Sequence, residues 1–83
     1  MHKVLLIDDE PMIRKMIQEY AQKEDLVFLE ASDGAEALDI LEKEEISLAV
    51  LDVMMPNLDG WATLREIRRI SDIPVILLTA RGE

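Results

Sequence analysis

The sequence predicts an α/β domain in which short strands alternate with helices. Apolar runs rich in Val, Ile and Leu recur at residues 4–7, 48–51 and 75–78. Runs of this length and composition are typical of strands buried on both faces of a parallel sheet. The segments between them place apolar residues at helical spacing. The resulting (βα)₃β order implies a parallel sheet with helices on both of its faces.

Four strands are expected along the chain. The first covers residues 3–7 and the second residues 27–31. The third covers residues 48–51, and the fourth covers residues 75–79 after Pro74.

Three helices are expected between these strands. The first covers residues 11–23, because Pro11 suits a first helical turn, and its apolar stripe contains Ile13, Met16, Ile17 and Tyr20. The second begins after Asp33, with Glu36 in capping-box position, and extends to about residue 44. The third begins after the cap Asp59 and extends to about residue 70. The inward-facing residues of the second and third helices are predicted to be Ala37, Leu38, Leu41, Leu64 and Ile67.

Composition restricts the class of protein and its partners. With 83 residues the chain forms one domain at most, and it has no cysteine, which is compatible with the cytoplasm. Its net charge of −9 disfavours nucleic acid and anionic membranes as direct partners and favours cations or basic protein surfaces. No apolar run approaches the roughly 20 residues that a membrane helix needs.

Acidic residues stand where two of the apolar runs end. Asp8 and Asp9 follow the first run, and Asp52 follows the third. Functional groups of open parallel sheets gather beyond the carboxyl ends of the strands, so these three carboxylates are expected to converge there. Because they repel one another, a hard divalent cation would stabilise the group.

Four segments together resemble the receiver domain of two-component response regulators. Their sequences are VLLIDDEP at 4–11, DGAEAL at 33–38, LDVMMPNLDG at 51–60 and PVILLTA at 74–80. The resemblance extends over the whole chain and over about the first two-thirds of a typical receiver. It implies a flavodoxin-like sheet with strand order 2-1-3-4, whose last βα units are missing, and it identifies residues 1–83 as a receiver domain fragment.

The resemblance also assigns roles to single residues. Asp52 corresponds to the aspartate that accepts a phosphoryl group from a histidine kinase. Asp8, Asp9, Asp52 and the backbone carbonyl of Met54 correspond to the ligands of Mg²⁺. Thr79 corresponds to the switch hydroxyl. Such a domain is a signalling module rather than an enzyme, with self-phosphorylation and autodephosphorylation as its only reactions.

One departure from the receiver pattern concerns the lysine that receivers carry at the end of the fifth strand. The chain ends before that position, so phosphoryl transfer is expected to be impaired. The fourth strand is expected to be an apolar edge strand, and such edges pair readily with other chains. We therefore expect self-association, as a homodimer or a larger assembly, through residues 75–79.

Two other classes of function remain as alternatives. One is a self-associating structural fragment without phosphoryl transfer. The other is a phosphatase of the haloacid dehalogenase type, which needs Asp-x-Asp after its first strand, whereas this chain has Asp8-Asp9-Glu10-Pro11. Nucleotide-binding folds are excluded because the chain has neither G-x-G-x-x-G nor a G-K-[ST] loop.

Overall fold

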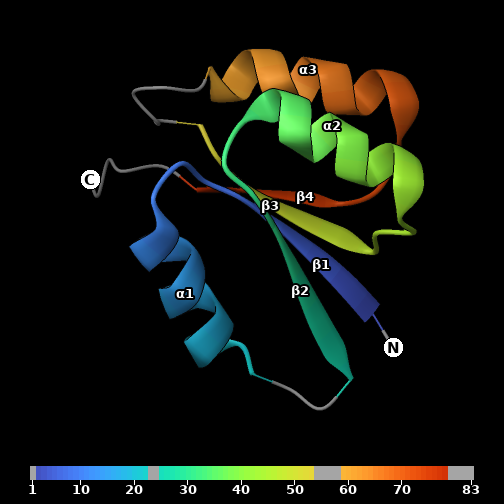
Figure 1. Cartoon of the computed structure of the whole chain (residues 1–83). Coiled ribbons are helices and arrows are strands. Elements are labelled where there is room, and N and C mark those ends of the chain that lie inside the picture. Colours follow the sequence, from blue (N-terminus) through green and yellow to red (C-terminus); the bar gives the residue numbers. More distant parts are fainter. Residues whose placement is uncertain (1, 23–24, 54–58, 79–83) are drawn as a thin grey trace.

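The computed structural model describes residues 2–22, 25–53 and 59–78 (Figure 1). Along these ranges the elements are, in order, β1 (His2–Ile7), α1 (Pro11–Tyr20), β2 (Leu26–Ala31), α2 (Gly34–Lys43), β3 (Leu48–Asp52), α3 (Gly60–Ile70) and β4 (Val75–Leu78). The predicted alternation of strands and helices is therefore confirmed.

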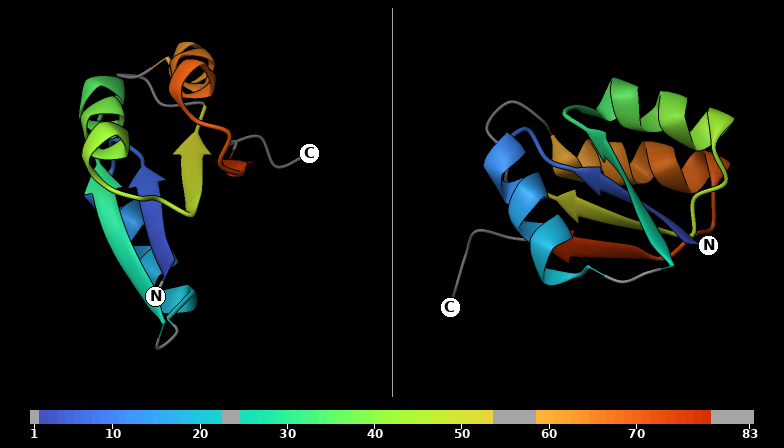
Figure 2. Two further views of the ribbon diagram at one scale, coloured as in Figure 1. Left: turned by 90° about the vertical axis from the view of Figure 1, so that its right-hand side faces the viewer. Right: turned by 60° about the horizontal axis from the view of Figure 1, so that its bottom comes forward.

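The four strands form one parallel sheet in the order β2-β1-β3-β4, as the resemblance implied. Figure 2 shows the strands running in the same direction. The most buried strand is β1, in which Leu5, Leu6 and Ile7 are at most 1% exposed. Because β1 pairs with both β2 and β3, its carboxyl end lies near the middle of the sheet. Polar residues placed there are surrounded by neighbouring strands.

Two apolar layers cover the two faces of the sheet. Helices α2 and α3 lie on one face and α1 lies on the other (Figure 1). The larger core lies under α2 and α3, and its buried residues are Leu5, Ile7, Ala31, Ala37, Ile46, Ala49, Leu51, Val53 and Ile67. The smaller core lies on the α1 side and contains Val4, Leu6 and Val50, with Ile17 packed against it.

Helix α1 is only partly covered. None of its ten residues, all of which the structure describes, is buried. Of the expected apolar stripe, Ile13 and Ile17 are half-buried, whereas Met16 is 46% and Tyr20 is 87% exposed. The stripe is amphipathic as predicted, but it is wider than the sheet surface that α1 covers. The helix ends at Tyr20 rather than at residue 23, because the polar residues after Ala21 offer no apolar surface that would extend the contact.

Helices α2 and α3 begin at the predicted caps. The Asp33 side chain accepts from the backbone N–H of Glu36 (2.8 Å), and the Asp59 side chain accepts from that of Ala62 (3.1 Å). The Glu36 carboxylate accepts from the backbone N–H of Ser32 (2.8 Å), which precedes the cap, so the box is displaced by one residue. The predicted inward-facing residues lie in or against the larger core.

Strand β4 forms an edge of the described sheet, as expected, and is described as far as Leu78. Its register with β3 pairs Val50 with Ile76 and Leu51 with Leu77, so Ile76 lies on the α1 face and Leu77 on the opposite face. Ile76 is 49% and Leu77 is 37% exposed. Apolar surface is thus exposed on both faces of this edge.

Candidate functional site

The sheet register places two of the predicted acidic residues side by side. Ile7 of β1 pairs with Leu51 of β3, so the next residue along each strand is an aspartate, Asp8 and Asp52. The two residues are separated by more than forty positions in the sequence. Their convergence at the carboxyl edge is the arrangement that the strand pattern predicted.

Asp8 is held by its backbone and by one carboxylate oxygen. Its N–H donates to the carbonyl of Ala31 (3.0 Å), and its own carbonyl accepts from Arg14 Nη1 (2.5 Å). Its Oδ1 accepts from the backbone N–H of Glu10 (2.9 Å). Asp8 is only 3% exposed, and its Oδ2 has no hydrogen-bond partner among the described residues. A buried carboxylate oxygen without a donor is costly, and a bound cation is one way to offset that cost.

The electrostatics of the edge agree with this geometry. Burial raises the pKa of the Asp8 carboxyl above its ordinary value, and the negative charges of Asp52, Asp9 and Glu10 raise it further. The hydrogen bond from the Glu10 N–H lowers the pKa of Asp8, but its effect is smaller than that of burial. The carboxylates therefore stand close enough to repel one another, as the sequence indicated.

The other predicted site residues differ in what the structure describes. Asp9 is half-buried, next to Asp8 and just before α1. Met54 and Thr79 lie outside the described residues, so their roles remain predictions.

The number and type of these residues decide which metal ion they could hold. Among residues 2–22, 25–53 and 59–78, no three His, Cys, Asp or Glu side chains form a group that could hold a metal ion by themselves. Magnesium, however, usually keeps several waters and takes only one or two protein carboxylates. The buried, unpaired Oδ2 of Asp8 beside Asp52 meets that smaller requirement.

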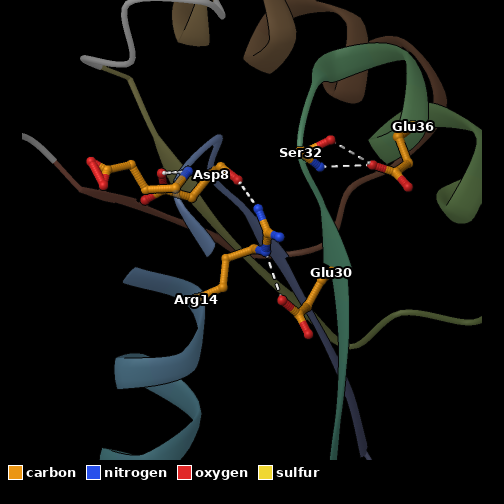
Figure 3. A network of polar contacts seen from close by, with 6 residues as sticks. Asp8, Arg14, Glu30, Ser32 and Glu36 are labelled. Atoms are coloured by element: carbon orange, nitrogen blue, oxygen red, sulfur yellow. Dashed lines mark hydrogen bonds and ion pairs between the residues drawn. The ribbon is translucent and has the colours of Figure 1, made fainter. Parts of the chain in front are cut away.

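Arg14 and Glu30 also belong to this region, although no sequence motif pointed to them. Arg14 Nε donates to Glu30 Oε1 (2.6 Å), and its Nη1 donates to the Asp8 carbonyl (Figure 3). Hydrogen bonds from Arg14 and then Gln18 lower the pKa of the Glu30 carboxyl. The one signal in the sequence was a glutamate near the end of an otherwise apolar strand.

Gly60 brings the start of α3 against the end of β3. A Cβ atom at Gly60 would lie 2.2 Å from the Val53 Cα and 2.9 Å from the Asp52 carbonyl oxygen. The sequence identified this glycine only as part of a turn. Its structural requirement is the close approach of two backbones, since its φ is not positive.

The comparisons with known proteins agree with this fold. Residues 4–83 match the family described as "Response regulator receiver domain". The chain is 48% identical over 81 residues to the probable transcriptional regulator ycf27 of Porphyra purpurea and 42% identical over 81 residues to the regulatory protein VanRc of Enterococcus gallinarum. Each match covers 98% of this chain but only 33% and 35% of those proteins, so the chain spans about a third of their length.

Solved structures of response regulator and chemotaxis proteins have a similar fold. The response regulator protein TrrA of Thermotoga maritima, in complex with Mg²⁺-BeF, has a TM-score of 0.86 and 37% identity over 99% of this chain and 72% of its own. Chemotaxis protein CheY4 of Vibrio cholerae has a TM-score of 0.88 and 31% identity over 100% of this chain and 72% of its own.

A parallel sheet of order β2-β1-β3-β4 with an acidic carboxyl edge defines a flavodoxin-like signalling domain. The chain belongs to the response regulator receiver domain family of two-component signalling.

Proposed function

We propose that this chain is a phosphoacceptor module that takes a phosphoryl group onto Asp52 with the help of Mg²⁺. The observation that carries the proposal is the buried, unpaired Oδ2 of Asp8 directly beside Asp52. In the transfer, an Asp52 carboxylate oxygen forms a bond to phosphorus while the donor's P–N bond breaks. Phosphoryl transfer needs mainly positioning and charge neutralisation; the sheet edge would position the acceptor, and a bound Mg²⁺ would offset the charge.

The magnesium ligands would be Asp8, Asp9, Asp52 and the Met54 carbonyl. When bound, the ion would offset the repulsion among the carboxylates and the charge of the phosphoryl oxygens. Thr79 would supply the switch hydroxyl. The domain would occupy residues 1–83 and act as a signalling module, its only reactions being self-phosphorylation and autodephosphorylation.

We propose a histidine kinase as the phosphoryl donor. TrrA, which is 37% identical to this chain, has been solved in complex with the histidine kinase ThkA. The net charge of −9 supports a partner with a basic surface rather than nucleic acid. We also propose a cytoplasmic location; none of the described helices is long and apolar enough to cross a membrane.

The 83-residue chain alone should accept the phosphoryl group slowly. Of the described lysines, Lys3 pairs with Glu44 and Lys43 with Asp39, and Lys15 lies on the outer surface of α1. None of these three, among the residues that the structure describes, lies at the carboxyl edge. No described lysine would therefore neutralise the phosphoryl oxygens.

The test is incubation with phosphoramidate and Mg²⁺ followed by intact-mass spectrometry. The wild-type chain should gain one phosphoryl group, slowly, and Asp52→Asn should gain none. The control Asp39→Asn changes an exposed aspartate on α2 and should react like the wild type. Equal labelling of Asp52→Asn would show that the acceptor is another residue.

Magnesium binding has its own test. Millimolar Mg²⁺ should raise the melting temperature of the wild-type chain, because a ligand that binds only the folded state stabilises it. Asp9→Ala should remove this increase. An unchanged melting temperature of the wild type would contradict the metal site.

The exposed edge of β4 favours a second function, self-association into a structural assembly without phosphoryl transfer. Ile76 and Leu77 expose apolar surface on its two faces. Exposed edges of this kind add strands from other chains. The two functions are separable, because substitutions at β4 and at Asp52 act on different parts of the sheet.

A further inference from the structure

Arg14 connects helix α1 to the acidic edge and to strand β2 at once. Its Nη1 donates to the Asp8 carbonyl (2.5 Å) and its Nε donates to Glu30 Oε1 (2.6 Å). Figure 3 shows the guanidinium group lying between the two acceptors. A planar guanidinium with donors in a fixed fork can hold two acceptors in a set direction, which an ammonium group cannot do as well.

Arg14 contacts an aspartate, Asp8, that already forms two other hydrogen bonds within the protein. Its N–H is bound to Ala31, and its Oδ1 is bound to the Glu10 N–H. With Arg14 on the carbonyl, three of the four polar atoms of Asp8 are fixed by the protein, and the fourth, Oδ2, is left for a ligand. The direction of Oδ2 therefore depends on how firmly the turn from Asp8 to Glu10 is held.

Solvent cannot easily replace Arg14 in this role. The Arg14 side chain is 14% exposed, and Asp8 is 3% exposed. A buried carbonyl that loses its donor keeps the full cost of its desolvation, so the turn would rearrange toward another donor or toward water. Glu30 orients the guanidinium, and the lowered pKa of its carboxyl indicates that the pair is charged in the folded chain.

We propose that Arg14 is a positioning residue for the acidic edge, and that it holds the turn from Asp8 to Glu10 so that Asp8 Oδ2 faces the cation. Glu30 acts through Arg14 by fixing its guanidinium. This inference rests on the proposed magnesium site. Neither residue would itself contact the metal or the phosphoryl group.

The charge of Arg14 and its positioning role predict opposite changes in Mg²⁺ affinity when the residue is replaced, so the inference can be tested. Arg14 is a cation near a site for another cation, so its removal should tighten Mg²⁺ binding if it acted only through its charge. If it positions Asp8, its removal should weaken binding despite the favourable change in charge.

The experiment is calorimetric titration of MgCl₂ into the 83-residue chain, at a temperature where circular dichroism shows each variant folded. We expect Arg14→Met to weaken Mg²⁺ binding about tenfold, the lower end of the effect of residues that orient metal ligands. The matched control Lys43→Met also removes one cation, from an exposed ion pair on α2, and should bind Mg²⁺ at least as tightly as the wild type. Arg14→Lys and Glu30→Gln should fall between the wild type and Arg14→Met.

A second measurement follows the turn itself, without metal. Amide hydrogen exchange at Glu10 should be about tenfold faster in Arg14→Met than in the wild type, because the hydrogen bond from the Glu10 N–H to Asp8 Oδ1 is weakened. Lys43→Met should leave this rate unchanged. If Arg14→Met does not fold, the Mg²⁺ titration and the Glu10 exchange measurement are made on Arg14→Lys and Glu30→Gln instead.

The outcomes separate this inference from the function on which it rests. If the wild type binds Mg²⁺ and Arg14→Met binds it equally tightly or more tightly, the positioning role of Arg14 is wrong and the metal site is unaffected. An unchanged Glu10 exchange rate in Arg14→Met would overturn it as well. Absence of Mg²⁺ binding by the wild type would instead overturn the metal site, and with it the metal-directed role of Arg14.

Discussion

At the residue scale, folding buries Asp8 but leaves one of its carboxylate oxygens without a hydrogen-bond donor in the described part of the chain. Its Oδ2 has no donor among the described residues, and three acidic neighbours raise its pKa in addition to burial. A residue of this kind lowers the stability of the domain in the absence of a bound cation. Such costs are typical of functional sites.

The pKa of Asp8 sets the direction of a pH dependence. Because its pKa is raised in the folded chain, the folded state binds the proton more tightly than the unfolded state does. The free energy of unfolding therefore falls as pH rises from the unfolded pKa through the folded one. Above the folded pKa the full cost of the ionised carboxylate is present.

Asp8→Asn should therefore stabilise the chain at pH 7 without Mg²⁺. A gain of about 1 kcal/mol would raise the melting temperature by roughly 4–8 °C in a domain of this size. The gain should disappear at pH values where wild-type Asp8 is protonated. The measurement is thermal unfolding by circular dichroism across pH, with the exposed Glu42→Gln as a control for net charge. A lower melting temperature of Asp8→Asn at pH 7 would contradict the unsatisfied state of Asp8.

At the scale of the elements, the contact between α3 and β3 depends on the absence of one side chain. Gly60→Ala would place a Cβ 2.2 Å from the Val53 Cα, so the backbones must separate. We expect a loss of about 2–3 kcal/mol in the free energy of unfolding, as for other overpacked sites. Urea titration measures it.

The comparison for Gly60→Ala is Gly34→Ala, in the first turn of α2. Gly34 has no positive φ, so alanine fits its backbone and should be neutral or slightly stabilising. Equal effects of the two substitutions would argue against the close approach at Gly60.

Helix α1 is attached to β2 through a charged pair, and this too has a pH signature. Hydrogen bonds from Arg14 and Gln18 lower the pKa of Glu30, so its contribution is complete above the unfolded pKa and is lost as pH falls through the folded one. Glu30→Gln should cost about 0.5–1 kcal/mol at neutral pH, because the Glu30 side chain is 44% exposed and solvent screens the pair. The difference in the free energy of unfolding between wild type and Glu30→Gln should shrink as pH falls from the unfolded pKa of Glu30 through the folded one. Urea titrations at several pH values measure this difference. A constant difference would mean that the charge of Glu30 contributes nothing.

The sequence predicted the elements well and their tertiary partners less well. Caps such as Asp33 and Asp59 act on residues three positions away, so their role is visible in the sequence. Arg14 and Glu30 are 16 positions apart and meet only because the fold brings α1 and β2 together, so no local pattern predicted the pair. The convergence of Asp8 and Asp52 was predictable, since the parallel register follows from the apolar runs.

The extent of burial was harder to predict. The apolar spacing in α1 predicted a stripe correctly, but Tyr20 is 87% exposed. Periodicity shows which residues share a face of a helix; it does not show how much of that face a neighbouring element covers. For the same reason the sequence indicated an edge strand without giving the exposure of Ile76 and Leu77.

At the scale of the whole molecule, the apolar edge of β4 predicts self-association. Light scattering across a concentration series should give a mass that rises above that of the 9.5 kDa monomer. Ile76→Lys should reduce this increase, because an ammonium group at the edge opposes strand pairing. The control is Ile70→Lys on α3, since Ile70 and Ile76 are both 49% exposed. A monomeric wild type at high concentration would contradict the prediction.

The order of the strands also has a consequence for synthesis on the ribosome. Asp52 is added to the growing chain 44 residues after its neighbour Asp8, from position 8 to position 52. At typical elongation rates this interval is roughly 2–9 s. Throughout this interval β1 lacks its neighbour β3, so Asp8 is free of the repulsion from Asp52. The electrostatic cost of the acidic edge thus arises only when the nascent chain pairs its third strand, and a divalent cation present at that moment would favour the pairing.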